Sequence, residues 1–320
     1  MRLQDAHVLV TGASGMIGSH LVAELAARGV RVRATVHQQQ PRQRINGVEY
    51  VTADLTRAGD CASVMEGIDF VFHGASVVVG AAATVANPLA TLTTASLVNL
   101  HILDAAYRAG VKKFLWLGST VAYPDAGARP LKEEEAMEGE PFEKYFTVGW
   151  MKRHMEVLCR IYGEKIPKPM TTLVLRPTNV YGPGDKFDPA KSHVSAALLR
   201  KVVERQNPIE VWGGGEDVRD LIYVDDVVRA MILAMEKLDR YTTLNIGLGR
   251  GYSVKEILAM LLEIDGYKEA RVIFDPAKPT MIPVRLVDVS KAERLLGFKP
   301  EISLRDGLSR TIAWFRSTRP

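Results

Sequence analysis

The fold of this chain is decided by residues 7–29, which read HVLVTGASGMIGSHLVAELAARG. His7 to Thr11 are mostly apolar and β-branched, and the run has the length of a buried strand. From Met16 to Arg28 the apolar residues recur at helical spacing, and Gly29 follows where such a helix would end. The segment therefore predicts a strand, a short glycine-rich turn and a helix in immediate succession, which is the start of a βαβ unit.

Three glycines shape the predicted turn. Gly12 permits a tight bend, Gly15 lets backbone amides approach a pyrophosphate, and Gly18 lets the helix pack closely on the strand. The amino end of the helix also attracts an anion. In this context the spacing predicts a dinucleotide site rather than an ordinary glycine turn of a doubly wound sheet. The residues predicted to bind the cofactor here are Gly12, Ser14, Gly15, Met16, Ile17 and Gly18.

The same alternation of strand and helix continues through the first half of the chain. Further strands are predicted at Arg31–Val36, Glu49–Thr52, Asp69–His73, Lys113–Leu117 and Thr172–Leu175, and helices at Thr91–Arg108 and Phe142–Tyr162. Such alternation is typical of a parallel sheet flanked by helices. We therefore predict an α/β fold, a Rossmann-type doubly wound parallel sheet, with residues 1–178 as the dinucleotide-binding domain.

The pattern changes after Tyr181, where Gly, Pro and Asp become dense. Helices are predicted there at Val194–Glu204, Val224–Glu236, Val254–Glu263 and Leu304–Phe315. We expect residues 179–320 to form mostly a smaller, discontinuous C-terminal α/β lid that binds the substrate. Within about 221–247, Leu221–Ala234 and Thr243–Gly247 are expected to return to the main sheet.

Composition excludes several classes of protein. The 320 residues are 47% apolar and 24% charged, which is typical of a globular protein. The net charge of +4 comes without a long basic run, so we expect no nucleic-acid partner. Cys61 and Cys159 match neither a metal site nor a disulfide framework. With no leader pattern and no apolar run of about 18 residues, a soluble cytoplasmic protein without a membrane partner or metal is expected.

The end of the second strand determines which dinucleotide is expected. An NAD-selecting carboxylate would stand about 20 residues beyond the glycine turn, but Val36 and His37 occupy that place. Surrounding basic residues favour NADP through its 2′-phosphate, with a solvated basic loop as the alternative. These residues are Arg33, His37, Arg42 and Arg44. After the third strand, Asp54 and Leu55 are predicted to contact adenine, although Asp54 is equally suited to cap the following turn.

Motifs along nearly the whole chain resemble the extended short-chain dehydrogenase/reductase superfamily and, within it, the GDP-L-fucose synthases. They are the GxxGxxG turn, Asp54-Leu55, Gly118-Ser119-Thr120, Ala122-Tyr123-Pro124, PTNVYGPGDKFDPAKSHVSAALLRK from Pro177, VWGGGEDVRDLIYVDD from Val211, FDPAKP from Phe274, and Arg285-Leu286-Val287-Asp288. The resemblance implies a nicotinamide lying against the pyranose ring of a nucleotide-diphosphate sugar. It also implies hydride transfer at C4 of a 4-keto sugar.

The resemblance assigns roles to individual residues. Ser119 is the implied hydrogen-bond donor to the sugar oxygen, which gains alkoxide character during reduction. Lys152 is implied to bind the nicotinamide ribose and to supply a positive field at the reacting centre. The same resemblance adds Ala75 and Pro177 to the cofactor site.

Two catalytic positions depart from the family's pattern. Its catalytic tyrosine stands one helical turn before the lysine, where this chain has Val148. Its epimerising cysteine stands where this chain has Val121, although the partner acid is retained as His193. We therefore expect reduction without the full 3,5-epimerisation. A replacement acid is sought in Tyr145, which lies on the same face of a continuous helix, in Thr120 or in a bound water; Tyr145 as a core or rim aromatic is the alternative.

The resemblance also implies a set of lid residues that hold the substrate. Arg219 has the strongest physical case among them, because a guanidinium binds phosphate through two parallel hydrogen bonds. Thr280 and Met281 replace an Asp-Gly pair of the synthases, which leaves GDP, CDP, UDP and dTDP open, with GDP favoured. The implied substrate-binding residues are Asn179, His193, Lys201, Trp212, Arg219, Lys278 and Arg285.

Three functions remain open at this point. The first is an NADP-dependent oxidoreductase acting on a nucleotide-linked 4-keto-6-deoxy sugar. The second is a nucleotide-sugar epimerase or dehydratase that keeps NAD(P) tightly bound. The third, suggested by Val148, is a catalytically feeble protein that binds cofactor and nucleotide sugar. The resemblance further implies a homodimer through Leu97–Ala106 and Val148–Ile161, although a monomer also needs amphipathic helices.

Overall fold

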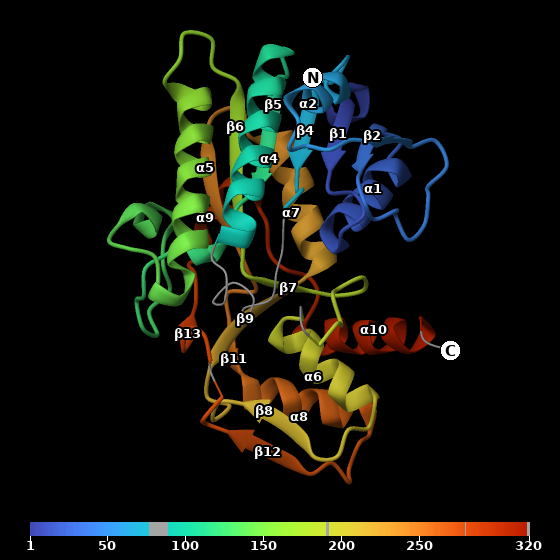
Figure 1. Cartoon of the computed structure of the whole chain (residues 1–320), viewed down its shortest axis with the longest axis vertical. Helices are drawn as coiled ribbons and strands as arrows, with labels where there is room; N and C mark the ends of the chain where they lie inside the picture. Colours follow the sequence, from blue (N-terminus) through green and yellow to red (C-terminus); the bar gives the residue numbers. More distant parts are fainter. Residues whose placement is uncertain (77–88, 190–191, 279, 319–320) are drawn as a thin grey trace.

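Seven parallel strands form the central sheet in the computed structural model, which describes residues 1–76, 89–189, 192–278 and 280–318. The strand order is β10-β6-β5-β4-β1-β2-β3 (Figure 1). The strands are β1 (His7–Thr11), β2 (Arg31–Val36), β3 (Glu49–Thr52), β4 (Phe70–His73), β5 (Lys113–Leu117), β6 (Thr171–Pro177) and β10 (Thr242–Ile246). This arrangement confirms the predicted Rossmann-type doubly wound sheet.

Helices cover both faces of this sheet. One face carries α2 (Ala58–Val64), α4 (Leu89–Arg108) and α5 (Phe146–Glu164), and the other carries α1 (Met16–Ala27), α7 (Val224–Lys237) and α9 (Ser290–Leu296). Because side chains alternate along a strand, Val8 and Val10 of β1 enter the core beneath α1 and α7, whereas Leu9 enters the core beneath α2 and α4. Two apolar cores therefore sandwich the sheet.

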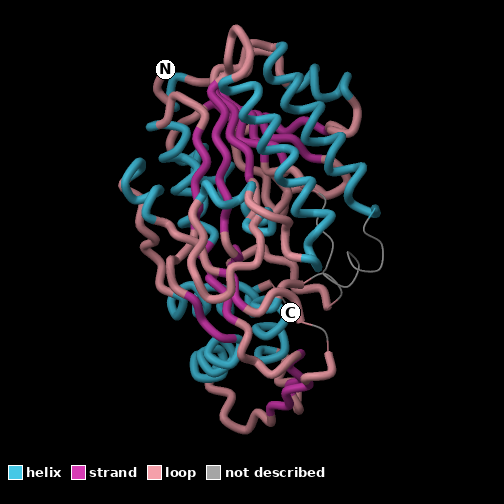
Figure 2. The backbone as a smooth tube through the Cα atoms, turned by 90° about the vertical axis from the view of Figure 1, so that its left-hand side faces the viewer, coloured by secondary structure: helices cyan, strands magenta, loops and turns pink. Residues whose placement is uncertain are grey.

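A smaller lid lies beyond the carboxyl edge of the sheet. Its strands are β7 (Asn179–Tyr181), β8 (Ile209–Trp212), β9 (Val218–Tyr223), β11 (Gly251–Ser253), β12 (Val272–Asp275) and β13 (Val284–Arg285), and its helices are α6 (Val194–Val203), α8 (Val254–Asp265) and α10 (Leu304–Ser317). Figure 2 shows the strands of the main sheet running toward this part of the molecule. Since β6 ends at Pro177 and β7 begins at Asn179, the chain enters the lid directly from the sheet.

Most predicted boundaries agree with the structure to within two residues, and two predictions do not. β1, β2, β3 and β5 begin and end at the predicted residues. The helix predicted from Phe142 begins only at Phe146, because Tyr145 has φ −111° and ψ 10° and leaves the helical path. Leu221 does not return to the main sheet, since β9 pairs with β7, β11 and β13 of the lid; of the segments predicted to return, α7 and β10 do so.

Short 3₁₀ helices complete the described part of the chain: η1 (Leu3–Asp5), η2 (Thr120–Ala122), η3 (Glu133–Met137) and η4 (Glu143–Tyr145). The last three lie between β5 and α5, next to the residues to which the sequence assigns chemistry. Within the described ranges, no helix has both the length and the apolar character needed to cross a membrane.

Candidate active site

The glycine turn between β1 and α1 has no room for a side chain at Gly12 or Gly18. Gly12 has φ +75°, and a Cβ there would lie 2.8 Å from the backbone nitrogen of Ala75. A Cβ on Gly18 would lie 2.1 Å from the carbonyl oxygen of Gly12. The Gly15 amide donates to that same oxygen at 3.0 Å. The backbone thus forms a bare cradle at the amino end of α1, which suits a pyrophosphate.

A buried hydrogen-bonded chain that the sequence analysis missed supports this cradle. Asn99 Oδ1 lies 2.9 Å from Nε2 of His73, and Nδ1 of His73 lies 2.7 Å from Thr11 Oγ1. Thr11 Oγ1 in turn accepts a hydrogen bond from the Ala75 amide. Burial lowers the pKa of His73 to about 4, so the ring is neutral at pH 7. This chain joins β1, β4 and α4 and fixes Ala75 against Gly12.

Three of the four basic residues predicted to favour NADP lie in the loop that follows β2. His37 is exposed directly after β2, and Arg42 follows it and donates to the Gly184 carbonyl while lying over Trp314. Arg44 lies over the ring of Tyr50. Ser14 of the glycine turn donates to the carbonyl of Gln39 in the same loop.

The placement of Arg33 with this loop is wrong. Arg33 lies in the middle of β2, opposite Leu9, rather than at its carboxyl end. Its guanidinium donates to the carbonyls of Val64 and Glu66 near the end of α2 and to Glu49. A cation at the carboxyl end of a helix is favourable, so its role is structural.

Asp54 and Leu55, which follow β3, make structural contacts within the protein. One carboxylate oxygen of Asp54 accepts hydrogen bonds from the amide and hydroxyl of Thr56, which lowers the pKa of Asp54. Leu55 is buried in the core beneath α2. Asp54 therefore caps the turn, the alternative that the sequence had left open.

The two residues with the strongest assigned chemistry both lie at the carboxyl end of β5. Ser119 precedes η2, and its hydroxyl accepts a hydrogen bond from the Val121 amide at 3.3 Å. Lys152 of α5 donates to the Leu117 carbonyl at 3.3 Å, and its Nζ lies 4.6 Å from the centre of the Trp116 ring. Burial lowers the pKa of Lys152 to about 8.

Neighbouring residues of α5, which the sequence analysis did not single out, hold Lys152 at this position. A Cβ on Gly149 would lie 2.4 Å from Pro141 and 2.8 Å from the Val121 carbonyl, so only glycine permits this approach. Arg153 donates to the carbonyls of Ala122, Gly139 and Glu138. In the sequence, the only indication of these contacts is a glycine and an arginine close to Lys152.

A buried ion pair fixes the next turn of α5. Both carboxylate oxygens of Glu156 accept hydrogen bonds from Arg176 of β6, at 2.8 and 2.5 Å. Arg176 also donates to the Tyr123 hydroxyl and to the Glu133 carbonyl. Because Arg176 engages both oxygens, Glu156 remains an indirect electrostatic neighbour of Lys152 rather than its ion-pair partner.

The candidate replacement acids lie at different depths. Val148 is half-buried one turn before Lys152, and Thr120 is buried in η2. Tyr145 does not share a continuous helix with them, because it precedes α5. Its ring lies 4.4 Å from the guanidinium of Arg285. Tyr145 therefore faces the lid, which corrects the position expected for it.

Two arginines stand side by side on the lid. Arg219 of β9 and Arg285 of β13 are register partners. Arg219 donates to the carbonyls of Val218 and Pro283 and to the carboxylate of Asp217. Arg285 is buried, and its Nη2 finds no acceptor among the residues that the structure describes. Buried nitrogens are normally satisfied, so this guanidinium is suited to an anionic ligand.

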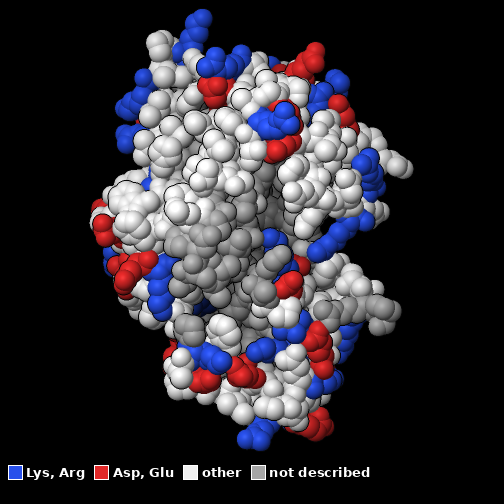
Figure 3. Space-filling model, viewed as in Figure 1, with Lys and Arg blue, Asp and Glu red and all other residues white. Residues whose placement is uncertain are grey.

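The other predicted lid residues form a second, more open group. Lys278 lies 5.8 Å from the centre of the Trp212 ring, which is 50% exposed. Lys201 donates to the carbonyl of Glu210 at 2.5 Å. Basic side chains border the hollow between sheet and lid in Figure 3.

Two further predicted residues lie apart from that group. Asn179 donates to the Asp220 carbonyl within the lid sheet. His193 is exposed and precedes α6.

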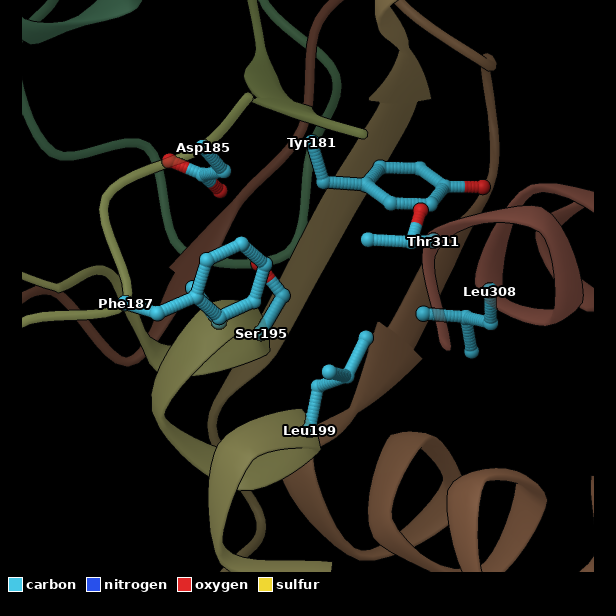
Figure 4. Close-up of a pocket in the computed structure, with 8 residues that line it drawn as sticks. Tyr181, Asp185, Phe187, Ser195, Leu199, Leu308 and Thr311 are labelled. Atoms are coloured by element: carbon cyan, nitrogen blue, oxygen red, sulfur yellow. The ribbon is translucent and has the colours of Figure 1, made fainter. Parts of the chain in front are cut away.

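A small crevice lies elsewhere in the lid, between α6 and α10 (Figure 4). It leaves no space for even a water-sized sphere, so it is not suited to a ligand. Asp185 Oδ2 and Ser195 Oγ line it without a hydrogen-bond partner in the described ranges, beside apolar Phe187, Leu199 and Leu308. No group of His, Cys, Asp and Glu suited to a metal occurs among the residues described.

Comparisons with known proteins agree with this geometry. A model of the NAD dependent epimerase/dehydratase family matches residues 8–247. The chain is 32% identical to GDP-L-fucose synthase of Escherichia coli (strain K12), over 98% of this chain and 97% of that protein. It is 30% identical to dTDP-4-dehydro-6-deoxy-D-allose reductase of Streptomyces bikiniensis, over 97% and 96%. The solved UDP-glucose 4-epimerase of Thermotoga maritima with UDP-glucose is similar with a TM-score of 0.87 and 30% identity, over 98% and 99%.

Proposed function

The chain belongs to the NAD dependent epimerase/dehydratase family, and from this premise we propose that it is an NADP-dependent reductase of a nucleotide-diphosphate-linked 4-keto-6-deoxy sugar. One observation carries the proposal: a glycine cradle with no room for a Cβ at Gly12 or Gly18 lies at the same carboxyl edge of the sheet as a buried lysine and a serine. Two such groups beside a dinucleotide cradle suit hydride transfer to a carbonyl.

The cofactor is assigned to the groove along the carboxyl ends of β1, β2 and β4. Gly12, Gly15 and Gly18 would face its pyrophosphate, and Lys152 its nicotinamide ribose, with Ala75 and Pro177 nearby. NADP is preferred because His37 and the basic loop with Arg42 and Arg44 follow β2, where an NAD site carries a carboxylate. When bound, the reduced nicotinamide supplies a hydride.

We assign the remaining roles in the reaction to individual side chains of the protein. We assign the Ser119 hydroxyl to donate to the oxygen of the sugar carbonyl, which becomes negative as the carbon is reduced. Lys152 holds a positive charge near that oxygen. Arg219 and Arg285 are the candidates for the diphosphate, since adjacent guanidinium groups match its charge and geometry. Trp212, Lys201 and Lys278 are assigned to the nucleoside end, and Asn179 to the sugar or its phosphate.

The proposed reaction lacks the full 3,5-epimerisation of the GDP-L-fucose synthases. Val121 replaces the cysteine that this step would need. His193, retained from that family's pattern, is exposed at the start of α6, where it remains a candidate for contact with the substrate. We propose GDP as the nucleotide; the similar proteins carry GDP, dTDP and UDP in their names, so the experiment compares these bases.

One observation favours a second candidate, a protein that binds cofactor and nucleotide sugar without turnover. A valine at position 148 cannot donate a proton, whereas reduction of a ketone requires one. Purified protein should be supplied with NADPH and with 4-keto-6-deoxyhexoses linked to GDP, dTDP or UDP. NADPH oxidation equal to the alcohol formed, measured by absorbance and NMR, supports the reductase. Binding of both ligands without turnover supports the second candidate instead.

The same assay separates a reductase from an epimerase or dehydratase with tightly held NAD(P). Those enzymes return the hydride within each turnover, so product would form without net consumption of reduced cofactor. Arg285→Gln is the matched variant: it should raise KM for the nucleotide sugar and leave the affinity for NADPH unchanged, because Arg285 lies on the lid.

We also propose that the protein is a cytoplasmic homodimer. α4 and α5 lie side by side and present apolar side chains outward, with Leu97 38%, Leu100 41%, Trp150 42% and Val157 45% exposed. An apolar patch that spans two helices suits a protein interface. Light scattering of the wild type and of a Val157→Lys variant tests it. Both cysteines are free and buried, as suits a reducing compartment.

A further inference from the structure

We propose that Lys152 is itself the acid that protonates the sugar oxygen in this chain, in place of a hydroxyl at position 148. The inference rests on the proposed reductase function. It is carried by the geometry at the carboxyl end of β5, where an ammonium group is buried with a single hydrogen-bond acceptor from the described protein.

The hydrogen-bonding capacity of Lys152 points to a ligand. An ammonium has three N–H donors, and in the described ranges Nζ donates only to the Leu117 carbonyl, at 3.3 Å. The side chain is nevertheless buried, with the residue only 8% exposed. Its other neighbour is the face of Trp116, which stabilises a cation without accepting a conventional hydrogen bond. Two donors therefore remain for the groups that enter the site.

Other hydroxyl groups are less suited to the step. Tyr145 lies before α5 and is engaged by Arg285 of the lid. Ser119 and Thr120 carry alcohols, which titrate far from neutral pH and are weak general acids. Lys152 lies on the helical turn after Val148, and burial lowers its pKa to about 8, close to the pH at which an efficient acid should titrate.

The charged groups around Lys152 leave its pKa lowered. Glu156, one turn further along α5, raises the pKa of Lys152, but Arg176 of β6 engages both of its carboxylate oxygens. His73 of β4 is neutral because burial lowers its pKa to about 4. Arg153 points toward the carbonyls of Ala122, Gly139 and Glu138. No carboxylate in the described chain forms an ion pair with Lys152 that would hold its proton.

The proposed step balances with the hydride donor already named. The carbonyl carbon gains a hydride from NADPH, and the π electrons of the C=O bond move to the oxygen. That oxygen forms an O–H bond with a proton from the Lys152 ammonium, whose N–H bond breaks and leaves a neutral amine. The amine then regains a proton from water, so the cycle consumes NADPH and one solvent proton and yields NADP⁺ and the alcohol.

Chemical rescue of a Lys152→Ala variant tests this proposal. At saturating NADPH and nucleotide sugar, turnover should fall by about 10²–10⁴-fold. Added primary alkylamines should restore part of it, with a rate that depends on the pKa of the ammonium. Lys152→Arg keeps the charge but should not restore turnover, because a guanidinium holds its protons at all accessible pH values. Lys113→Arg, at the other end of β5, is the control for replacement of a buried lysine.

A readout independent of turnover accompanies the kinetics. The rate at which a small acylating reagent modifies Lys152 and Lys113 should be followed by mass spectrometry across pH in the protein without ligands. Lys152 should become reactive at a lower pH than an ordinary lysine. The proposal is overturned if Lys152→Arg keeps wild-type turnover, if rescue is independent of amine pKa, or if Tyr145→Phe alone abolishes the pH dependence of turnover.

Failure of the proposed function has a different signature. If the wild type binds NADPH and nucleotide sugars but oxidises no NADPH with any 4-keto substrate, the reductase itself is wrong. If the wild type turns over and the amine series shows no dependence on pKa, only the role of Lys152 as the acid is wrong.

Discussion

Two lysines at opposite ends of β5 are equally buried and differently used. Lys113 begins the strand and Lys152 lies against its carboxyl end, and each is 8% exposed. Lys113 donates to the carbonyls of Met235 and Leu238 at 3.0 and 2.9 Å and pairs with Asp239 at 2.6 Å. Lys152 has one carbonyl acceptor at 3.3 Å in the described chain.

The difference shows how burial relates to function. The Lys113 ammonium uses its three donors on the protein and stabilises the carboxyl end of α7, where a cation is favourable. The Lys152 ammonium is desolvated without full compensation, a cost that a structural role would not justify. Incomplete satisfaction of a buried charge, rather than burial alone, distinguishes Lys152 from Lys113 and supports the role proposed for it.

The largest expected contrast between the two lysines is in catalysis. Lys152→Met should lower kcat by about 10²–10⁴-fold, because it removes the proposed acid. Lys113→Met should leave kcat per folded molecule unchanged, because it lies at the opposite edge of the sheet. Steady-state NADPH oxidation, normalised to folded protein by circular dichroism, measures both. Equal losses in the two variants would remove the functional distinction.

For the free energy of unfolding we expect the opposite contrast, in which replacement of Lys113 is the harmful change. Lys113→Met leaves two carbonyls at the end of α7 without their donor and should lower the free energy of unfolding by about 1–3 kcal/mol. Urea unfolding followed by fluorescence gives the value. A variant as stable as the wild type would mean that water replaces the ammonium at no cost.

Lys152→Met should instead stabilise the protein without ligands near pH 7, by about 1–2 kcal/mol. This gain is the free-energy cost of desolvating the ammonium minus the favourable free energy of its contacts with Trp116 and Leu117. Since the pKa of Lys152 falls from 10.5 to about 8 on folding, the cost is fully present below pH 8. It is relieved between pH 8 and 10.5, where the unfolded chain binds more protons.

The pH dependence of the stability difference between Lys152→Met and the wild type tests whether folding lowers the pKa of Lys152. The stability advantage of Lys152→Met over the wild type should shrink as pH rises from 8 toward 10.5, the interval between the two pKa values. Urea midpoints at several pH values measure it. An advantage that grows with pH would show that the pKa of Lys152 is not lowered in the folded protein.

The smallest expected effect concerns Trp116. Trp116→Phe keeps an aromatic face beneath Lys152 but weakens its attraction for the cation. A loss of about 0.5–1 kcal/mol should lower the pKa of Lys152, and with it the alkaline limb of the kcat profile, by about half a pH unit. Phe70→Leu, beside Lys113, should leave the profile unchanged. An upward shift with Trp116→Phe would contradict the assigned cation–π contact.

Local patterns predicted the elements that local physics controls. The glycine turn, β1, β2, β3 and β5 were placed correctly because strand composition, helical period and tight turns are encoded over a few adjacent residues. Arg33 was misplaced because a strand position does not reveal which helix end its side chain reaches. Tyr145 was misplaced because the preceding 3₁₀ turn shifted the start of α5.

The sequence by itself determined the Rossmann-type sheet, the dinucleotide cradle and the absence of a tyrosine at position 148, because each depends on residue type at short spacing. Only the tertiary structure decided that Lys152 meets Trp116 and Leu117, that Arg176 engages Glu156, and that Arg285 is buried beside Arg219. These contacts join residues distant in sequence, and burial and charge compensation arise only when folding brings such residues together.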